Sequence, residues 1–119
     1  MYNVGTDIVE VDRIRNLIDK YQSKFIDRIF SKNEIAYCNN KKDPSIHFAG
    51  KFSAKEAVKK ALSNKYKDTF FSFKEISINN NDKGRPFISI DNFNSKFIDI
   101  SISHTNSYAI SFAILQIND

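Results

Sequence analysis

The sequence has little cysteine, proline, glycine and tryptophan. Its 119 residues include one cysteine, two prolines, three glycines and no tryptophan. The single cysteine, Cys38, excludes an intrachain disulfide and a cysteine-based metal cage, and it suits a reducing compartment. We interpret Cys38 as a helix residue without chemical function. The chain also lacks a long apolar run and a basic leader segment, so we expect a soluble, cytoplasmic protein.

Length and charge limit the kind of ligand. One domain, residues 1–119, accommodates the chain, so a large ligand would lie on the surface or between copies. The formal net charge is +4, and residues 41–67 carry eight lysines against two acidic residues, which leaves −2 for the rest. This concentration of positive charge favours an anionic partner such as a phosphate compound, a nucleic acid or an acidic protein. A solvated basic helix face explains the charge equally well.

The N-terminal part of the sequence predicts a strand and then helices. Residues 2–11 form the strand, in which Gly5 permits close approach of another backbone or a ligand. Asp12 is the predicted N-cap of a helical region that extends to Phe30. Ser31 and Glu34 form a capping-box pattern that opens a short helix.

A long central helix and four strands follow. Asp43 before Pro44 predicts the helix start, and the pattern breaks near Ser63-Asn64. The predicted strands have alternating apolar positions and cover residues 73–78, 86–90, 98–102 and 108–117. We therefore predict an α+β fold with a mostly antiparallel sheet packed against the long helix.

Two acids and a lysine are the first candidates for chemistry. Glu56 and Lys60 are one turn apart on the central helix, beside Phe52, and this alone fits an ordinary exposed helix pair. Asp7 lies inside a predicted strand, where it could simply contact a lysine or an arginine. If Asp7 and Glu56 met, a cation would have to neutralise them, and hard oxygen ligands favour Mg²⁺.

Two further features are weak when taken singly. His104 closes an apolar strand before a turn, where a hydrogen-bonded structural histidine is the common case. Gly84-Arg85-Pro86 is consistent with a simple turn into an edge strand.

Taken together, these motifs resemble the holo-acyl-carrier-protein synthase family, which are small phosphopantetheinyl transferases. The resemblance runs from Gly5 almost to the C-terminus. It is carried by Gly5-Thr6-Asp7-Ile8-Val9-Glu10, Phe48-Ala49-Gly50-Lys51-Phe52-Ser53-Ala54-Lys55-Glu56-Ala57, Gly84-Arg85-Pro86 and Ile102-Ser103-His104-Thr105. Two positions depart from the family pattern. Lys51 stands where arginine is usual and loses the bidentate fork, and Ser63-Asn64-Lys65 replaces a Gly-Thr-Gly-like turn.

The resemblance implies transfer of 4′-phosphopantetheine from coenzyme A to a serine of apo-acyl carrier protein. In this scheme Asp7 and Glu56 hold Mg²⁺ and act with Lys60 and His104 as the catalytic set. The residues implied to bind coenzyme A are Lys51, Lys60, Asn64, Gly84, Pro86 and His104. The serine proton passes to Asp7 or a metal-bound water, with His104 as the alternative acceptor.

The resemblance also implies an acidic carrier protein as partner and a homotrimer with sites between subunits. We predict a docking patch made of Arg13, Leu17, Tyr21, Lys24, Phe25 and Arg28, with Lys20 beside it. Its apolar residues could equally belong to the core. Two other hypotheses remain open, a basic non-enzymatic module that binds RNA or an acidic protein, and an inactive relative kept as a subunit.

Overall fold

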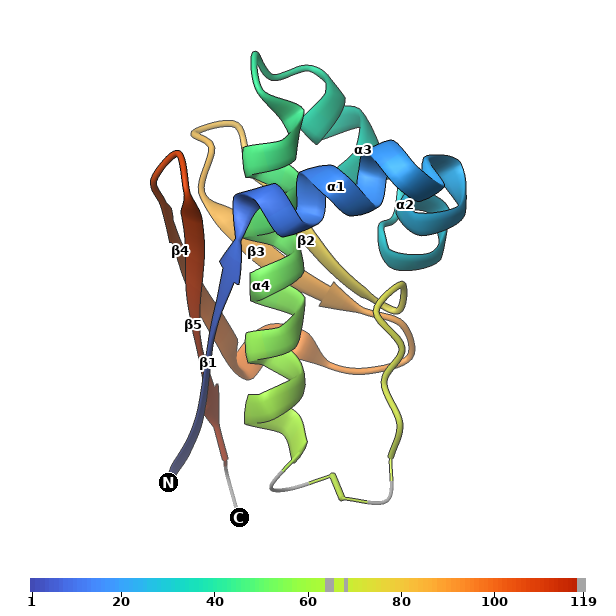
Figure 1. Cartoon of the computed structure of the whole chain (residues 1–119). Coiled ribbons are helices and arrows are strands. Elements are labelled where there is room, and N and C mark those ends of the chain that lie inside the picture. Colours follow the sequence, from blue (N-terminus) through green and yellow to red (C-terminus); the bar gives the residue numbers. More distant parts are fainter. Residues whose placement is uncertain (64–65, 68, 118–119) are drawn as a thin grey trace.

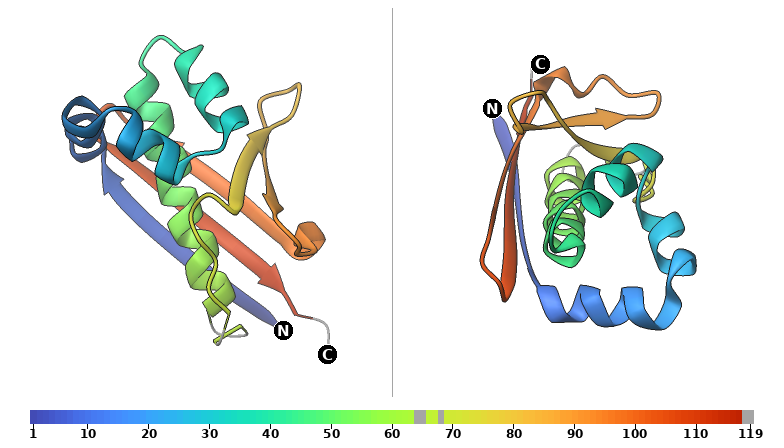
Figure 2. Two further views of the ribbon diagram at one scale, coloured as in Figure 1. Left: turned by 90° about the vertical axis from the view of Figure 1, so that its right-hand side faces the viewer. Right: turned by 90° about the horizontal axis from the view of Figure 1, so that it is seen from above.

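The computed structural model describes residues 1–63, 66–67 and 69–117. Its central element is the helix α4, Pro44–Ser63, which begins at the predicted proline. Three shorter helices precede it, namely α1 (Val11–Tyr21), α2 (Ser23–Ile29) and α3 (Lys32–Asn39). Seen along α4, these helices lie on one side and a sheet on the other (Figures 1 and 2). No helix in the described residues is long and apolar enough to cross a membrane.

The strands form two antiparallel sheets. The larger has the order β1-β5-β4 and contains β1 (Tyr2–Glu10), β5 (Tyr108–Gln116) and β4 (Ile98–His104). The smaller pairs β2 (Ile76–Asn80) with β3 (Pro86–Ile90), and a short 3-10 helix, η1 (Ser95–Phe97), follows it. The predicted α+β class, with antiparallel strands against a long helix, is confirmed.

Two local predictions need correction. Asp12 does not cap α1: the N-cap position is Glu10, and Asp12 lies in the first turn, where it accepts from Arg15 at 2.6 Å. The strand predicted over residues 73–78 begins only at Ile76 and continues to Asn80, because Ser72 and Glu75 bind each other in a local turn.

The core lies on both sides of α4, because buried residues lie around most of the circumference of this helix. One cluster joins its second half to β2–β5, and the other joins its first half to α1–α3. The capping box of α3 is confirmed: Ser31 Oγ accepts from the Glu34 amide, and Glu34 Oε1 accepts from the Ser31 amide at 2.7 Å. Cys38 is buried in α3, and burial raises the pKa of its thiol to about 12. It is therefore an uncharged core residue.

Candidate active site and adjoining pocket

The strand β1 crosses α4 at backbone contact distance. A Cβ built on Gly5 would lie 2.0 Å from the carbonyl oxygen of Ala57 and 2.8 Å from the amide nitrogen of Ala61. Real Cβ atoms essentially never come within 3.0 Å of such atoms, so this crossing requires glycine in the strand. The small side chains of Ala57 and Ala61 complete the close contact on the helix.

The crossing brings a strand carboxylate to the helix. Side chains alternate along a strand, so Asp7 shares with Gly5 the face that is turned to α4. The Lys60 ammonium donates to Asp7 Oδ1 at 3.2 Å and to the carbonyl oxygen of Thr6 at 3.0 Å. The predicted contact of Asp7 with a basic side chain is therefore present.

Glu56 lies one turn before Lys60 on the same stripe of α4. It is half-buried, and among the described residues its carboxylate makes no hydrogen bond or ion pair. The ordinary Glu56–Lys60 pair is thus absent, because Lys60 binds Asp7 instead. The described residues contain no group of three or more histidine, cysteine, aspartate or glutamate side chains suited to a metal ion.

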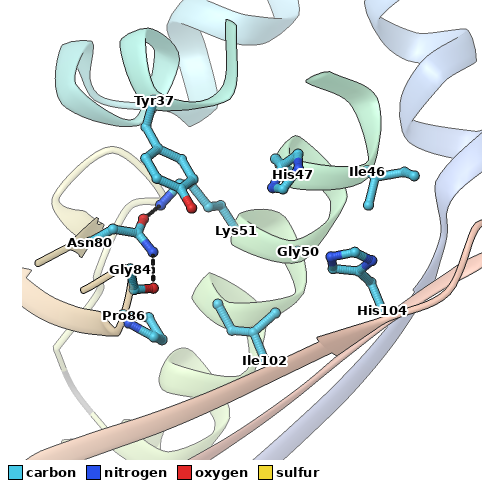
Figure 3. A pocket seen from close by; sticks show the side chains of 10 residues that line it. All are labelled: Tyr37, Ile46, His47, Gly50, Lys51, Asn80, Gly84, Pro86, Ile102 and His104. Carbon is cyan, nitrogen blue, oxygen red and sulfur yellow. Dashed lines mark hydrogen bonds between the residues drawn. The ribbon is translucent and has the colours of Figure 1, made fainter. Parts of the chain in front are cut away.

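A second group of predicted residues lines one pocket between α4, β3 and β4. The pocket has a volume of about 190 Å³, and Lys51, Gly84, Pro86 and His104 are all on its wall (Figure 3). The structure therefore brings the predicted ligand-binding residues together in two groups, Asp7 with Lys60 at the crossing and these four in the pocket. Asn64 lies outside the described residues.

Lys51 lies on the pocket wall, and its ammonium makes two hydrogen bonds within the chain. The residue is 3% exposed, and Nζ donates to the carbonyl oxygen of Ile78 and to Asn80 Oδ1, each at 2.6 Å. The same nitrogen lies 4.5 Å from the ring centroid of Tyr37. Burial lowers the pKa of Lys51, because the charged form loses water that these contacts only partly replace.

The pocket also holds a histidine that sequence reasoning missed. His47 of α4 faces His104 of β4, with ring centroids 5.6 Å apart in an edge-to-face arrangement. Burial, followed by the charges of His104 and Lys41, lowers the pKa of His47. Its position one turn before Lys51 on the helix was the available signal.

A buried ion pair supports the helix that carries Glu56. Lys55 Nζ lies 2.7 Å from Glu34 Oε1, and both side chains are fully buried. Lys55 also donates to the carbonyl oxygens of Phe73 and Ile76, while Glu34 Oε2 accepts from the Ile78 amide at 2.8 Å. Sequence reasoning found Glu34 as a capping residue and missed its second role.

The predicted docking residues are only partly surface residues. Leu17 and Tyr21 line a shallow groove along α1 with the basic residues Arg13 and Lys20. Tyr21 is exposed and Leu17 half-buried. The three residues on α2 differ: Lys24 and Arg28 are exposed, whereas Phe25 is half-buried and packs against the ring of Phe30. The apolar part of the patch thus belongs in part to the core.

Comparison with known proteins places these features in one family. The model of the 4′-phosphopantetheinyl transferase superfamily matches residues 3–113. The chain is 43% identical to a holo-[acyl-carrier-protein] synthase of Protochlamydia amoebophila, over 93% of this chain and 94% of that one. It is 39% identical to the synthase of Clostridium acetobutylicum, over 96% of both chains.

Solved structures agree with this result. The holo-[acyl-carrier-protein] synthase of Helicobacter pylori in complex with coenzyme A is 32% identical with a TM-score of 0.80, covering 95% of this chain and 99% of that one. The Bacillus anthracis synthase, in complex with CoA (3′,5′-ADP), is 31% identical with a TM-score of 0.77, covering 95% and 94%. Since both the sequence and the fold match along almost the whole chain, this protein belongs to the holo-[acyl-carrier-protein] synthase family of the 4′-phosphopantetheinyl transferase superfamily.

Proposed function

We propose that this protein transfers the 4′-phosphopantetheine group of coenzyme A to a serine of apo-acyl carrier protein, in support of fatty acid biosynthesis. The observation that carries the proposal is the contact of Asp7 with Lys60 where β1 crosses α4, one turn from Glu56, which has no partner among the described residues. One carboxylate on β1, and a carboxylate and an ammonium one turn apart on α4 near the crossing, suit a phosphate substrate and a hard metal ion. The names of the relatives, and the coenzyme A of two solved structures, support the same reaction.

The residues at the crossing fit a magnesium ion held by Asp7 and Glu56. Magnesium commonly takes one or two protein carboxylates and completes its shell with water and phosphate oxygens, so a third protein ligand is not required. Asp7 has 17% of its side chain exposed and already attracts the Lys60 ammonium, which indicates that a cation is favourable there. When bound, magnesium would withdraw charge from the phosphate oxygens.

The chain's own groups have separate tasks in the proposed reaction. The carrier serine oxygen bonds to the β-phosphorus, the bond from that phosphorus to the bridging oxygen breaks, and adenosine 3′,5′-bisphosphate leaves. Lys60 offsets negative charge on the phosphates, because its side chain is more than half exposed and its ammonium can turn from Asp7. Asp7 is our candidate acceptor for the serine proton, and His104 is the alternative.

The pocket beside α4 is the proposed site for the rest of the nucleotide. Gly84 has a φ of 83° and is exposed, so it gives the turn before β3 an open shape. Pro86 and His104 stand on the same pocket wall as Lys51, which anchors Asn80 there. We propose that these residues contact coenzyme A, with Asn64 as a further candidate outside the described residues.

An acidic carrier protein suits the exposed cations of α1 and α2. Arg13 and Lys20 line the α1 groove beside Leu17 and Tyr21, where Glu10 and Asp12 balance their charge, and Lys24 and Arg28 add positive charge on α2. Opposite charge on the partner would speed the encounter, while the apolar side chains would contribute most of the buried contact.

An exposed apolar face of the larger sheet supports the proposed homotrimer. Val4 pairs with Ile114 and Ile8 with Ile110 in the β1–β5 register, so these side chains share the face turned away from α4. Val4 is 54% exposed, Ile8 62% and Phe112 46%. Such a patch commonly marks an interface, and a second copy would cover it.

Light scattering after size exclusion should report a trimer, and Ile8→Asp should yield smaller species. A monomeric wild-type protein would contradict this proposal.

One assay tests the proposed reaction. The protein is mixed with coenzyme A, Mg²⁺ and apo-acyl carrier protein, and intact mass spectrometry should find one added phosphopantetheine group on the carrier. Absence of transfer with retained carrier binding would favour an inactive relative. Salt-sensitive binding of unrelated nucleic acids, independent of coenzyme A, would favour a basic binding module. The need for coenzyme A and the reduced thiol of Cys38 support a cytoplasmic location.

A further inference from the structure

Three consecutive residues of α4 face three different parts of the molecule. Successive residues of an α-helix point about 100° apart, so Lys55, Glu56 and Ala57 do not share a face. Ala57 lies where β1 crosses the helix at Gly5, and Glu56 is half-buried next to it. Lys55 is fully buried on the side of α3 and β2 (Figure 2). The helix is therefore held on both sides of the residue proposed to bind the metal.

The ammonium of Lys55 uses all of its hydrogens inside the core. Nζ lies 2.7 Å from Glu34 Oε1, and it donates to the carbonyl oxygens of Phe73 at 2.8 Å and Ile76 at 2.5 Å. An ammonium has three hydrogens, so these three oxygens satisfy it completely. Hydrogen bonds depend on direction, whereas apolar contacts do not. Three such bonds from one nitrogen therefore fix both the depth and the rotation of α4 at Lys55.

Glu34 joins the same ammonium to two other elements. Its Oε1 also accepts from the Ser31 amide of the α3 capping box at 2.7 Å, and its Oε2 accepts from the Ile78 amide of β2 at 2.8 Å. Among the described residues, no other ion pair has both side chains fully buried. A substrate does not reach this carboxylate, so its effect on a reaction must pass through the elements that it joins.

A buried ion pair of this kind adds little net stability. Removing two charges from water costs about as much as their attraction provides, and apolar side chains of similar volume commonly stabilise a fold as well. Apolar side chains lack direction, however, so a helix that rests on them can turn or slide at small cost. A misplacement of about 1 Å can lower a reaction rate about 100-fold, so this difference matters for Glu56.

We propose that Lys55 and Glu34 are positioning residues for the transfer reaction: their buried pair fixes the rotation of α4, and with it the position of the Glu56 carboxylate relative to Asp7. Neither residue touches substrate or metal, since both side chains are fully buried. The inference rests on the proposed function, which assigns the metal to Asp7 and Glu56. It predicts that stability and metal affinity respond differently when the pair is replaced.

Two single variants and their combination separate positioning from stability. Glu34→Gln leaves a buried ammonium unpaired and Lys55→Met leaves a buried carboxylate unpaired, so each should lower the urea midpoint by about 1.5 to 2.5 M. The double variant buries no charge and should recover at least half of that loss. Its transfer activity per folded molecule should stay about 100-fold below that of the wild type, because the directed bonds of Lys55 are absent. Recovery of activity together with stability would overturn the proposal.

Metal binding gives a readout that does not depend on turnover. Calorimetry of Mg²⁺ added to the protein with coenzyme A should give a roughly tenfold higher Kd for the double variant. The carrier KM should not change, because neither residue lies in the docking patch. Arg15→Gln is the matched control: it breaks the ion pair with Asp43 that joins α1 to the start of α4, and Mg²⁺ affinity should stay at the wild-type value. Equal Mg²⁺ affinity in the double variant and the wild type would contradict the proposal.

Glu34→Asp keeps the proposal testable if the double variant does not fold. It preserves the charge of the pair but shortens the side chain by one methylene, so α3, β2 and α4 must shift to keep their contacts. The urea midpoint should fall less than in Glu34→Gln, while Mg²⁺ binding weakens. Wild-type Mg²⁺ affinity in the folded Glu34→Asp protein would refute the positioning role. Failure of the proposed function is distinct, because the wild-type protein itself would then bind no Mg²⁺ with coenzyme A or would transfer no phosphopantetheine.

Discussion

Replacing Gly5 with alanine tests whether the crossing of β1 over α4 sets both stability and activity. The new Cβ would lie 2.0 Å from the Ala57 carbonyl oxygen, against a minimum of about 3.0 Å in real structures, so the strand and helix must separate by about 1 Å. Both obstructing atoms belong to the helix backbone and cannot rotate away. Overpacking of this kind costs typically 1–3 kcal/mol, and we expect about 3 kcal/mol here because no side chain can yield.

Urea unfolding followed by circular dichroism measures this cost. With a slope of about 2 kcal/mol per molar urea, a loss of about 3 kcal/mol lowers the midpoint by about 1.5 M. Phosphopantetheine transfer should fall more than tenfold in the folded fraction, since a shift of about 1 Å separates Asp7 from Lys60 and misplaces reacting groups.

Gly50→Ala is the matched control, because it places the same methyl group at another buried glycine. Its Cβ would meet Ile102 Cγ2 at 3.3 Å, a flexible side chain that can move by a few tenths of an ångström. Alanine also favours the interior of a helix over glycine by about 1 kcal/mol, so this variant should lie within about 1 kcal/mol of the wild type. Equal midpoints for Gly5→Ala and the wild-type protein would refute the reasoning.

Four further predictions follow from the site and the core. Glu56→Gln should keep the fold and lower Mg²⁺-dependent transfer on the order of 100-fold in a single-turnover assay, because it removes one proposed metal ligand. Arg28→Glu should raise the KM for the carrier roughly tenfold and leave the coenzyme A Kd unchanged, because this exposed cation lies in the proposed docking patch. Glu34→Gln should cost about 3–5 kcal/mol in urea unfolding, since Lys55 would remain buried without its counter-charge. The pKa of His47 is lower in the folded than in the unfolded chain, so the unfolded chain binds more protons. Unfolding free energy should therefore fall as the pH drops below about 6.5, and His47→Phe should remove this part of the slope.

Each of these predictions has its own control. Full activity of Glu56→Gln at limiting Mg²⁺ would refute its role as a metal ligand. Lys96→Glu reverses an exposed charge outside the docking patch, and an effect on the carrier KM as large as that of Arg28→Glu would argue against a specific patch. Asp99→Asn removes an exposed pair at 3.6 Å and should cost under about 1 kcal/mol. An unchanged pH slope in His47→Phe would assign the slope to other groups.

The sequence alone determined the order of elements and most of their boundaries, because these follow from local signals. Asp43-Pro44 marked the start of α4, and the Ser31–Glu34 capping box marked α3. The motifs around Asp7 and Glu56 also sufficed for the family, since the spacing of motifs along the chain carries that information. The wrong prediction of Asp12 as a helix cap shows where local signals fail. Asp12 binds Arg15 instead, and Arg15 also binds Asp43, which lies far along the chain.

The tertiary structure decided which of these residues meet. No periodicity could indicate that Gly5 touches α4 or that Lys60 binds Asp7 rather than Glu56, because the partners are more than 50 positions apart. The pairing of His47 with His104 and the burial of Lys51 were equally hidden. Local sequence fixes backbone preference over a few residues, whereas contacts between distant segments depend on how strand and helix pack. At this site, the packing of a strand glycine against two helix alanines brought the charges together.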